Sequence, residues 1–417
     1  CGAVDDVVAA LPAATPVTLR VARAVKVIGM PLTQAQCADA LRRLGLPVQE
    51  EPGLITVTPP SFRFDLQIEE DLIEEVARMV GYNNLPHTPP QAPITAKIRQ
   101  EAQRSAFAVR RSLAALGYQE TINFSFVEER WEHELAGNPN PIKLLNPIAS
   151  QLSVMRSSLL GSLLNVLKFN TDRKAARVRV FELGRVFRKD ASVLDSETTV
   201  AGFDHPMRVA ALAWWDAEQQ LWGLPARAVD FFDVKGDVEA LLAPLQPSFE
   251  PASHPAMHPG RCARVLLDGR AIGFVGELHP QWRQSWELPQ VPVLFELELD
   301  AVLRRAVPRF APVHKHQAVE RDLAVVVAEK VTHADIMGAI HAALPATLLR
   351  GAVLFDVYRS KVAKDGSVTG GLALGEKSLA VRLTLGGEAT LTDAEIDAAV
   401  QSVLARLAEQ TGAKLRV

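Results

Sequence analysis

The sequence predicts a multidomain α+β protein. Two proline-rich stretches, 86–93 and 307–312, interrupt the chain, because proline can neither extend a helix nor donate to a strand ladder. Helical and strand-like patterns alternate between these breaks. For 417 residues, at roughly 100–200 residues per domain, we expect about three folded domains. They are predicted at residues 16–90, 94–307 and 308–417, after a remnant of a preceding domain at 1–15.

The composition is that of an ordinary globular protein, with 48% hydrophobic and 22% charged residues. Cys1, Cys37 and Cys262 are too scattered for a disulfide framework, which is the pattern of a reducing compartment and predicts the cytoplasm. No apolar run reaches the roughly 18 residues of a membrane span, so we expect no membrane partner. The net charge of −3 excludes extensive coating of nucleic acid and leaves only local RNA-binding patches.

The first domain is predicted to be a small winged-helix-like module. Thr33 and Gln36 form a capping box that opens a helix ending at Gly45. A short strand, Leu54–Thr58, follows. A second helix is predicted from apolar residues on one face and ends at Gly81; these residues are Ile68, Leu72, Val76 and Val80.

The middle domain is predicted to be a mixed sheet covered by helices. Its strand-like runs are Ile122–Phe126, Val178–Phe187, Met207–Trp215 and Val293–Leu299, and its helical patterns cover 98–116, 157–169 and 234–243. The proline-dense segment Pro244–Pro259 is predicted to be a long loop.

The last domain shows the ferredoxin-like order of strand, helix, two strands, helix and strand. The strands are predicted at Asp322–Val327, Val353–Arg359, Ser378–Leu385 and Lys414–Val417. Capping boxes beginning at Thr332 and Thr392 open the two helices.

An acidic cluster in the second predicted helix is a candidate magnesium site. Asp71, Glu74 and Glu75 fall at i, i+3 and i+4, opposite the apolar face, and Asp65 lies just upstream. Magnesium takes one or two carboxylates and keeps several waters. Spacing alone, however, favours a solvated acidic face near a helix N-terminus, with Asp65 as a cap, because acidic helix faces are common in soluble proteins.

A zinc site at His254, His258 and Cys262 is a weaker hypothesis. The spacing of four and the residue types suit zinc. Pro255 and Pro259, however, exclude a regular helix that would stack the three side chains, and no fourth ligand is evident. The sequence argues against zinc here.

The runs Pro59–Leu66 and Glu69–Pro86 resemble the signature of the bacterial phenylalanine–tRNA ligase beta subunit family. The resemblance covers about residues 16–417 and implies the C-terminal part of such a chain, lacking the N-terminal tRNA-binding domain and most of the editing domain. It implies that Asp65, Asp71, Glu74 and Glu75 hold Mg²⁺ at the contact with a catalytic alpha subunit.

The middle domain resembles the inactive, catalytic-like domain of that family, a relative of class II synthetase cores. The matching runs are Leu152–Leu160, Val180–Phe187, His258–Ala263 and Gly273–Pro280. The chain also contains no Walker-type phosphate loop. We therefore predict no catalytic residue in this chain, with ATP and phenylalanine bound by the alpha subunit of an alpha2beta2 heterotetramer.

The last domain resembles the ferredoxin-fold anticodon-binding domain of the family, through Glu320–Ala324, Leu354–Tyr358, Lys377–Ala380 and Thr390–Ile396. It departs from the family at His316-Gln317, which replaces Phe-Pro, and at an apparent insertion, Ala363–Leu374. Exposed aromatic and basic side chains on a sheet suit single-stranded RNA. The predicted contacts with tRNA(Phe) are Arg321, Tyr358, Lys377 and Arg382, although Phe355 and Tyr358 could instead pack in a core.

The leading hypothesis is therefore a beta subunit that assembles with the alpha subunit and binds tRNA. The alternative is a nucleic-acid-binding regulatory protein that uses the helix-turn-helix-like first domain. Residues 16–90 carry 7 basic and 9 acidic side chains, which is a poor surface for phosphates. A magnesium hydrolase would need a nucleophile or general base beside the carboxylates, and none is evident.

Overall fold

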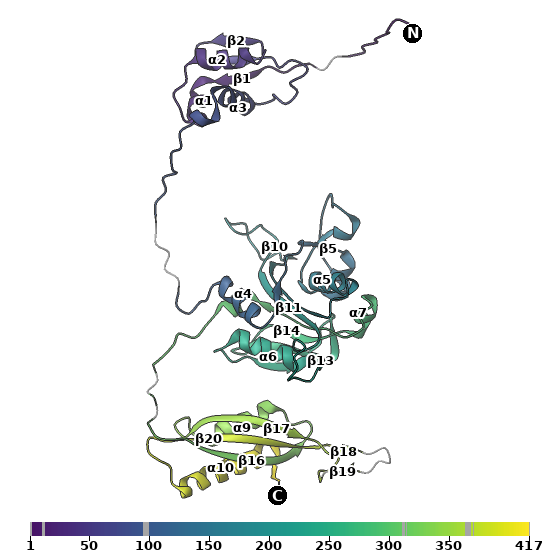
Figure 1. Ribbon diagram of the computed structural model, residues 1–417, viewed down its shortest axis with the longest axis vertical. Helices are drawn as coiled ribbons and strands as arrows, with labels where there is room; N and C mark the ends of the chain where they lie inside the picture. Colours follow the sequence, from purple (N-terminus) through teal and green to yellow (C-terminus); the bar gives the residue numbers. More distant parts are fainter. Residues whose placement is uncertain are drawn as a thin grey trace. The chain divides into compact units, whose positions relative to one another are not determined.

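The computed structural model describes residues 2–10, 13–94, 100–310, 313, 315–362, 368–369 and 371–416. The chain divides into two compact units, Cys1–Arg99 and Gln100–Val417 (Figure 1). The largest sheets of the second unit are a seven-stranded one in the central region (residues 100–307), with two hydrophobic cores, and a four-stranded one in the C-terminal region (residues 308–416), with a separate core. The mixed α/β, multidomain prediction is confirmed, whereas the exact domain boundaries stay a prediction.

The N-terminal unit packs three helices around a three-stranded antiparallel sheet in the order β1-β3-β2. Its elements are β1 (Val17–Arg20), α1 (Val21–Ile28), α2 (Gln34–Arg43), β2 (Val48–Glu51), β3 (Leu54–Val57) and α3 (Glu69–Val80). The capping box predicted at Thr33 is present, with the Thr33 side chain accepting from the Gln36 backbone N–H. Of the predicted apolar face, Leu72 and Val76 are fully buried in the core of this unit and Val80 is partly buried, whereas Ile68 precedes α3 and is 55% exposed.

The central region is built on a seven-stranded sheet in the order β12-β13-β14-β15-β11-β8-β4, which is antiparallel except for the β4–β8 pair. The strands are β4 (Gln119–Glu120), β8 (Arg177–Arg185), β11 (Met207–Trp215), β12 (Ser248–Pro251), β13 (Met257–Leu267), β14 (Arg270–Leu278) and β15 (Val293–Glu298). A second, three-stranded sheet is formed by β5 (Phe126–Val127), β6 (Ile142–Lys143) and β7 (Val154–Met155), and β9 (Arg188–Lys189) pairs with β10 (Phe203–Asp204).

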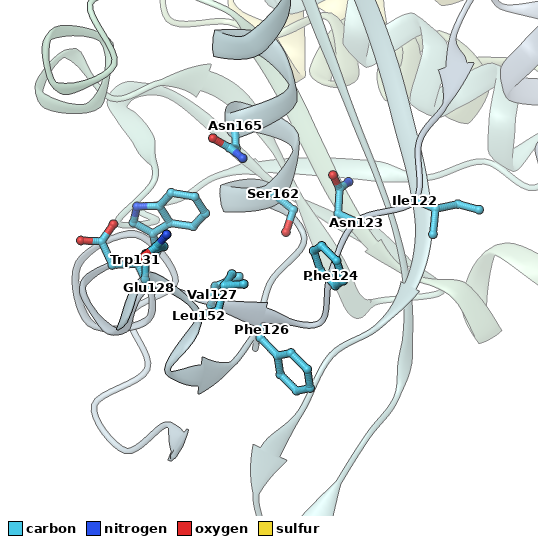
Figure 2. Close-up of a pocket in the computed structure, with 11 residues that line it drawn as sticks. Ile122, Asn123, Phe124, Phe126, Val127, Glu128, Trp131, Leu152, Ser162 and Asn165 are labelled. Atoms are coloured by element: carbon cyan, nitrogen blue, oxygen red, sulfur yellow. The ribbon is translucent and has the colours of Figure 1, made fainter. Parts of the chain in front are cut away.

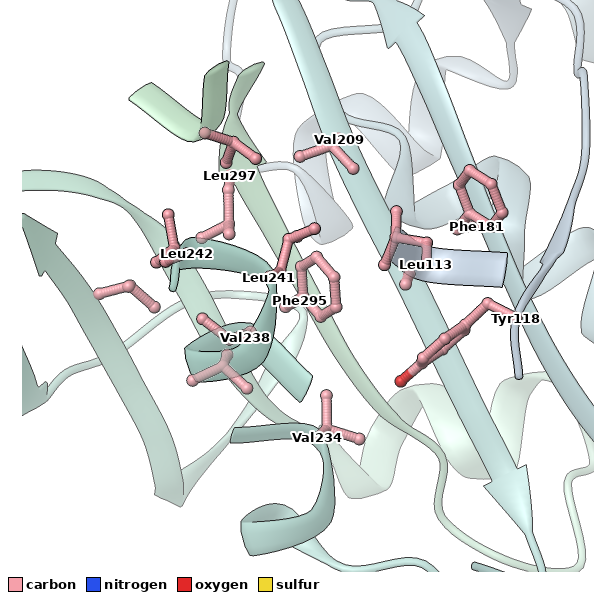
Figure 3. Close-up of a cluster of buried hydrophobic side chains, with 14 of the residues drawn as sticks. Leu113, Tyr118, Phe181, Val209, Val234, Val238, Leu241, Leu242, Phe295 and Leu297 are labelled. Atoms are coloured by element: carbon pink, nitrogen blue, oxygen red, sulfur yellow. The ribbon is translucent and has the colours of Figure 1, made fainter. Parts of the chain in front are cut away.

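Helices cover both faces of the large sheet. One core contains side chains of α4 (Ala106–Ala115), α6 (Phe231–Leu242) and α8 (Leu299–Leu303). The other contains side chains of α5 (Leu160–Asp172) and α7 (Pro280–Ser285). Figure 3 shows the first core, where Phe181 of β8 and Phe295 of β15 lie among aliphatic side chains of α4 and α6. The central region is therefore a three-layer α/β/α arrangement.

Three predictions for the central region are wrong in detail. The strand predicted at Ile122–Phe126 is absent, because the flanking β4 joins the large sheet while β5 joins the small one, so residues 121–125 cross between them. The loop predicted at Pro244–Pro259 contains β12, which pairs with β13. The helix predicted at 98–116 begins only at Ala106, and residues 98–99 lie outside the described part of the chain.

The C-terminal region is a four-stranded antiparallel sheet in the order β17-β20-β16-β21. Its elements are β16 (Val319–Ala328), α9 (His333–Ala343), β17 (Leu349–Tyr358), β20 (Glu376–Leu385), α10 (Asp393–Thr411) and β21 (Lys414–Leu415). The ferredoxin-like order and both predicted capping boxes are confirmed. The apparent insertion Ala363–Leu374 follows β18 (Lys361–Val362) and includes β19 (Val368–Thr369), but residues 363–367 and 370 lie outside the described chain.

Across the described residues, no helix combines the length and apolar character that a bilayer crossing needs.

The central core should be sensitive to loss of Phe295. This side chain is fully buried, so Phe295→Ala leaves a cavity and should cost about 3–5 kcal/mol of unfolding free energy. The matched control is Phe310→Ala, because Phe310 is 93% exposed. Urea unfolding of both variants tests the assignment, and a loss of the same size in the control would contradict it.

Candidate functional site

The acidic cluster of α3 is held together by arginine. Arg63 Nη2 lies 2.7 Å from Asp65 Oδ2 and 2.9 Å from Glu75 Oε1, and Arg78 also pairs with Glu75. The Arg63 guanidinium holds the pKa of Asp65 below its usual value. Burial alone would raise the pKa of Glu75, but hydrogen bonds from Arg78 and Arg63 outweigh it and lower the pKa. Two of the four predicted magnesium ligands, Asp65 and Glu75, therefore already bind one cation, the Arg63 guanidinium of the same chain.

The other two carboxylates serve different purposes. Asp71 Oδ2 accepts from the backbone N–H groups of Gln67 and Ile68, each at 2.8 Å, and so fixes the start of α3. Glu74 is exposed whereas Glu75 is buried, so they do not share one solvated surface as the spacing predicts. Across the described residues, no three His, Cys, Asp or Glu side chains are grouped as a metal site. As they lie, the four carboxylates do not fit a magnesium ion, and the assignment stays a prediction.

The three candidate zinc ligands each have another environment. The Nδ1 atoms of His254 and His258 accept backbone N–H groups of Ala256 and Gly260, at 3.1 and 3.0 Å. Burial lowers the pKa of His254 to about 4 and raises the pKa of Cys262 to about 11. A protonated thiol is a poor zinc ligand, because the thiolate is the form that binds metal.

Three carboxylates of the central region, two of them buried and that of Glu296 half-buried, hold one segment, Arg156–Leu159, just before α5. Glu132 Oε1 accepts from the Ser157 backbone N–H at 2.8 Å, and Glu182 Oε1 accepts from Arg156 Nη2 at 2.7 Å. Glu296 accepts from the Leu159 N–H at 2.6 Å and from the Ser158 hydroxyl at 3.1 Å. Burial raises the pKa of Glu296. We call this segment with its three acids the carboxylate clamp.

A cavity of about 580 Å³ opens beside the clamp (Figure 2). Figure 2 shows apolar side chains of Trp131, Phe124 and Leu152 on its walls, together with the polar groups of Asn123 and Asn165. Nearby apolar residues of the same region are strongly exposed: Ile122 by 92%, Phe124 by 71%, Leu145 by 103% and Ile148 by 82%. An exposed apolar surface of this kind is typical of a protein interface.

On the C-terminal sheet, two arginine–aromatic pairs lie on the face opposite the helices. The Arg382 guanidinium lies 5.4 Å from the Phe355 ring centroid, and Arg416 lies 4.8 Å from that of Tyr358. Arg382 also forms a bidentate ion pair with Asp322, with two N–O distances of 2.8 Å. That guanidinium holds the pKa of Asp322 below its usual value.

The four predicted RNA contacts are divided between the two faces of this sheet. Alternation along β20 places Arg382 on the open face, because its neighbours Val381 and Leu383 are buried against the helices. In the β16–β20 pair, Arg321 lies opposite Leu383 and Lys377 lies opposite Val327. Paired residues share a face of the sheet, and Leu383 and Val327 are buried against the helices, so Arg321 and Lys377 lie on the helix side, at opposite ends of the sheet. Lys377 Nζ donates to the Glu329 carbonyl at 2.8 Å.

Arg416 was missed by sequence reasoning. It follows a two-residue strand, and nothing in the local pattern indicates that its guanidinium reaches Tyr358 of another strand. Phe355 was expected as either a base-stacking or a core residue. Its contact with Arg382 depends on the register of β17 and β20, in which Val353 lies opposite Arg382, and the sequence alone does not give this register.

Comparison with protein families identifies the class of the chain. Family models match residues 17–82 as "tRNA synthetase B5 domain", 85–299 as "Phenylalanyl tRNA synthetase beta chain CLM domain" and 314–416 as "Ferredoxin-fold anticodon binding domain". Two of these descriptions name a tRNA synthetase, and the third names an anticodon-binding domain.

The particular family follows from similar proteins. The chain is 49% identical over its full length to the phenylalanine–tRNA ligase beta subunit of Ralstonia nicotianae, and 50% identical over its full length to that of Cupriavidus pinatubonensis. The protein of Chromobacterium violaceum is 46% identical over the full chain. This chain belongs to the phenylalanine–tRNA ligase beta subunit family. It spans 51% of each of these relatives, and none of the matches supports the alternative of a separate regulatory protein.

The buried His254 should make the central region acid-sensitive. Its pKa in the folded protein, about 4, lies below the value of about 6.5 expected when unfolded, so the unfolded state binds the proton first. Stability should therefore fall as the pH decreases from 6.5 to 4, by about 2–3 kcal/mol. Unfolding of His254→Asn, which keeps a hydrogen-bond acceptor, should lack this decrease. His258→Asn is the control, and an unchanged pH profile in His254→Asn would contradict the assignment.

Proposed function

We propose that this chain supports the ATP-dependent attachment of phenylalanine to tRNA(Phe) by an alpha subunit, through subunit assembly and tRNA binding. The observation that carries the proposal is the extent of the similarity, which runs through the whole chain at 49% identity rather than through one domain. In this proposal, residues 16–90 and 94–307 contact the alpha subunit and residues 308–417 bind tRNA. ATP and phenylalanine bind the alpha subunit of a cytoplasmic alpha2beta2 heterotetramer, and no residue of this chain is catalytic.

The exposed apolar surface around the cavity of Figure 2 supports the assembly part of the proposal. Ile122 and Phe124 lie just before β5, and Leu145 and Ile148 lie between β6 and β7 of the small β5-β7-β6 sheet. A contiguous apolar patch of a water-exposed protein is stabilised when a partner covers it. We therefore assign this surface to the alpha subunit.

Charged substitutions on this surface should abolish assembly. Placing carboxylates at a buried interface is costly, so Ile122→Asp with Phe124→Asp should prevent co-purification with the alpha subunit and phenylalanine-dependent charging of tRNA. Leu221→Asp with Trp222→Asp is the matched control, because these residues are 54% and 104% exposed in another loop of the same region. Equal recovery of the complex from both double variants would reject the assigned surface.

The prediction that this chain has no catalytic residue has its own test. Formation of phenylalanyl-adenylate by the chain alone would contradict it.

The two arginine–aromatic pairs support the RNA part of the proposal. Rings on an open sheet can stack on bases while guanidinium groups meet phosphates. Arg321, Tyr358, Lys377 and Arg382 are the proposed contacts, and the geometry favours Tyr358 and Arg382 because these two occupy the open face.

Loss of the Tyr358 ring should weaken tRNA binding. Tyr358→Ala removes a stacking partner worth about 1–3 kcal/mol, which corresponds to roughly 5- to 150-fold in affinity. Tyr82→Ala, which changes a 55% exposed tyrosine of the N-terminal unit, is the control. Lys377→Ala should reduce tRNA affinity less than Tyr358→Ala does, because Lys377 lies on the helix side of the sheet. The measurement is tRNA affinity at fixed salt, and a larger loss for Lys377→Ala than for Tyr358→Ala would show that the helix side of the sheet binds RNA.

For the metal, we propose that Mg²⁺ binds the acidic surface of α3 in competition with Arg63. Support comes from Asp65 and Glu75, which already converge on a single cation. Arg63→Gln would free Asp65 and one oxygen of Glu75, whose other oxygen would keep its ion pair with Arg78.

This competition predicts a stronger magnesium response in the variant. Thermal unfolding with and without Mg²⁺, and with and without the alpha subunit, should show a larger Mg²⁺-dependent stabilisation in Arg63→Gln than in the parent. Asp71→Asn with Glu75→Gln should remove the response. Equal responses to Mg²⁺ in all three proteins, in the complex as well as alone, would reject the magnesium site.

A further inference from the structure

A second cavity of the central region, of about 410 Å³, is polar and cationic. It lies between the loop at residues 136–140 and the start of β9, and Arg188 and Lys189 both line it. The other polar side chains that line it are Asn138, Asn140 and Ser157, none of which carries a negative charge. An anion is the natural complement of this set of side chains.

Half of the arginines of the same region form an ion pair with a carboxylate, whereas, in the part of the chain that the structure describes, the two cations of this cavity do not. Arg156, Arg179, Arg227 and Arg261 each form an ion pair with a carboxylate. Among the ion pairs within the described residues, neither Arg188 nor Lys189 takes part. Even Asp204, which lies opposite Arg188 in the β9–β10 pair, forms no ion pair with it. Within the described residues, these two adjacent positive charges thus have no carboxylate in ion-pair contact, although the charge of Arg188 also acts on Glu296, where it opposes the burial that raises the pKa of that carboxyl.

The shape of the cavity is fixed by buried groups. The Glu132 side chain is only 2% exposed, and its carboxylate accepts from the Ser157 N–H and from Asn138 Nδ2, both at 2.8 Å. The Asn138 backbone N–H also donates to the Glu132 carbonyl, at 2.7 Å. The loop is therefore preorganised by the same acid that belongs to the carboxylate clamp.

Neutral acceptors hold both cations at the cavity. Lys189 Nζ donates to Asn140 Oδ1 at 2.8 Å, and Arg188 Nη2 lies 3.4 Å from the Ser157 carbonyl oxygen. An amide or carbonyl oxygen orients a cation without cancelling its charge. Both side chains consequently keep their full positive charge at the cavity surface.

We propose that this cavity binds a phosphate group. A guanidinium presents paired N–H donors that match two phosphate oxygens, and a neighbouring ammonium supplies a point charge. Two cations together balance the charge of about −2 on a phosphate monoester. The chemistry is shared by a free phosphate ester and by the RNA backbone, and the proposal does not depend on the function proposed for the open face of the C-terminal sheet.

The sharpest test is an isosteric change that adds one charge. Asn140→Asp would place a carboxylate beside Lys189 and neutralise it without removing any cation. We expect inorganic phosphate to bind the parent chain and to bind Asn140→Asp at least about tenfold more weakly. Arg188→Gln with Lys189→Gln should show no saturable binding. Calorimetric titration and phosphate-dependent thermal stabilisation, both at constant ionic strength, provide the measurements.

A matched control separates a site from general electrostatics. Arg173→Gln with Lys174→Gln removes another adjacent exposed pair of cations, at the end of α5, which does not line this cavity. This control should bind phosphate as the parent does. Equal phosphate binding by all variants, equal losses in the control and the cavity variants, or no binding to the parent would each overturn the proposal.

Two further ligands distinguish the source of the phosphate. If adenosine monophosphate shows the same dependence on Arg188 and Lys189 while tRNA affinity does not, the site takes small phosphate esters. If tRNA affinity falls in the double variant, with a reduction of about 2 in the salt dependence, the site contacts the RNA backbone. Tyr358→Ala should leave inorganic phosphate binding unchanged, which keeps this site separate from the RNA surface proposed on the C-terminal sheet.

Discussion

The central region depends on the carboxylate clamp. Glu132, Glu182 and Glu296 come from three different elements, yet all hold the four residues Arg156–Leu159. Burying an acid, wholly or in part, is unfavourable unless it accepts well-formed hydrogen bonds, and here each of the three does. The side chain of Arg156 is 3% exposed and that of Glu182 is 4% exposed, so removing either partner would leave a buried, uncompensated charge.

The clamp also positions the two cavities described above. The clamped segment leads directly into α5, whose Ser162 and Asn165 line the larger cavity. On its other side, Ser157 and the loop held by Glu132 line the phosphate cavity. A single network of buried hydrogen bonds therefore determines where an apolar surface and a cationic cavity are presented. The remaining cores, made of aliphatic and aromatic side chains, provide stability without specifying these positions.

Much of the fold could be predicted because its signals are local. The capping boxes at Thr33, Thr332 and Thr392 each involve residues three apart, and all three are present. The strand predicted at Ile122–Phe126 failed because its residues serve two sheets, and partner choice is not a local property. The prediction that the acidic residues of α3 share one surface was wrong for a similar reason. Helical spacing places Glu75 beside Asp71, but it contains no information about Arg63, which precedes the helix and covers Glu75.

Charge pairing explains how a chain with a net charge of −3 can present the two proposed anion-binding surfaces, and why they should differ in strength. On the open face of the C-terminal sheet, Arg382 is engaged by Asp322 and lies 3.4 Å from Glu320, so a phosphate there must compete with two carboxylates. Competition of this kind lowers the electrostatic gain, and the rings of Phe355 and Tyr358 must then supply much of the binding energy by stacking. At the phosphate cavity, Arg188 and Lys189 are held by neutral oxygens, and no carboxylate has to be displaced. The first surface is therefore suited to reading bases and the second to holding a charge, because the acids nearby, rather than the number of cations, decide how much of the positive charge is available to a ligand.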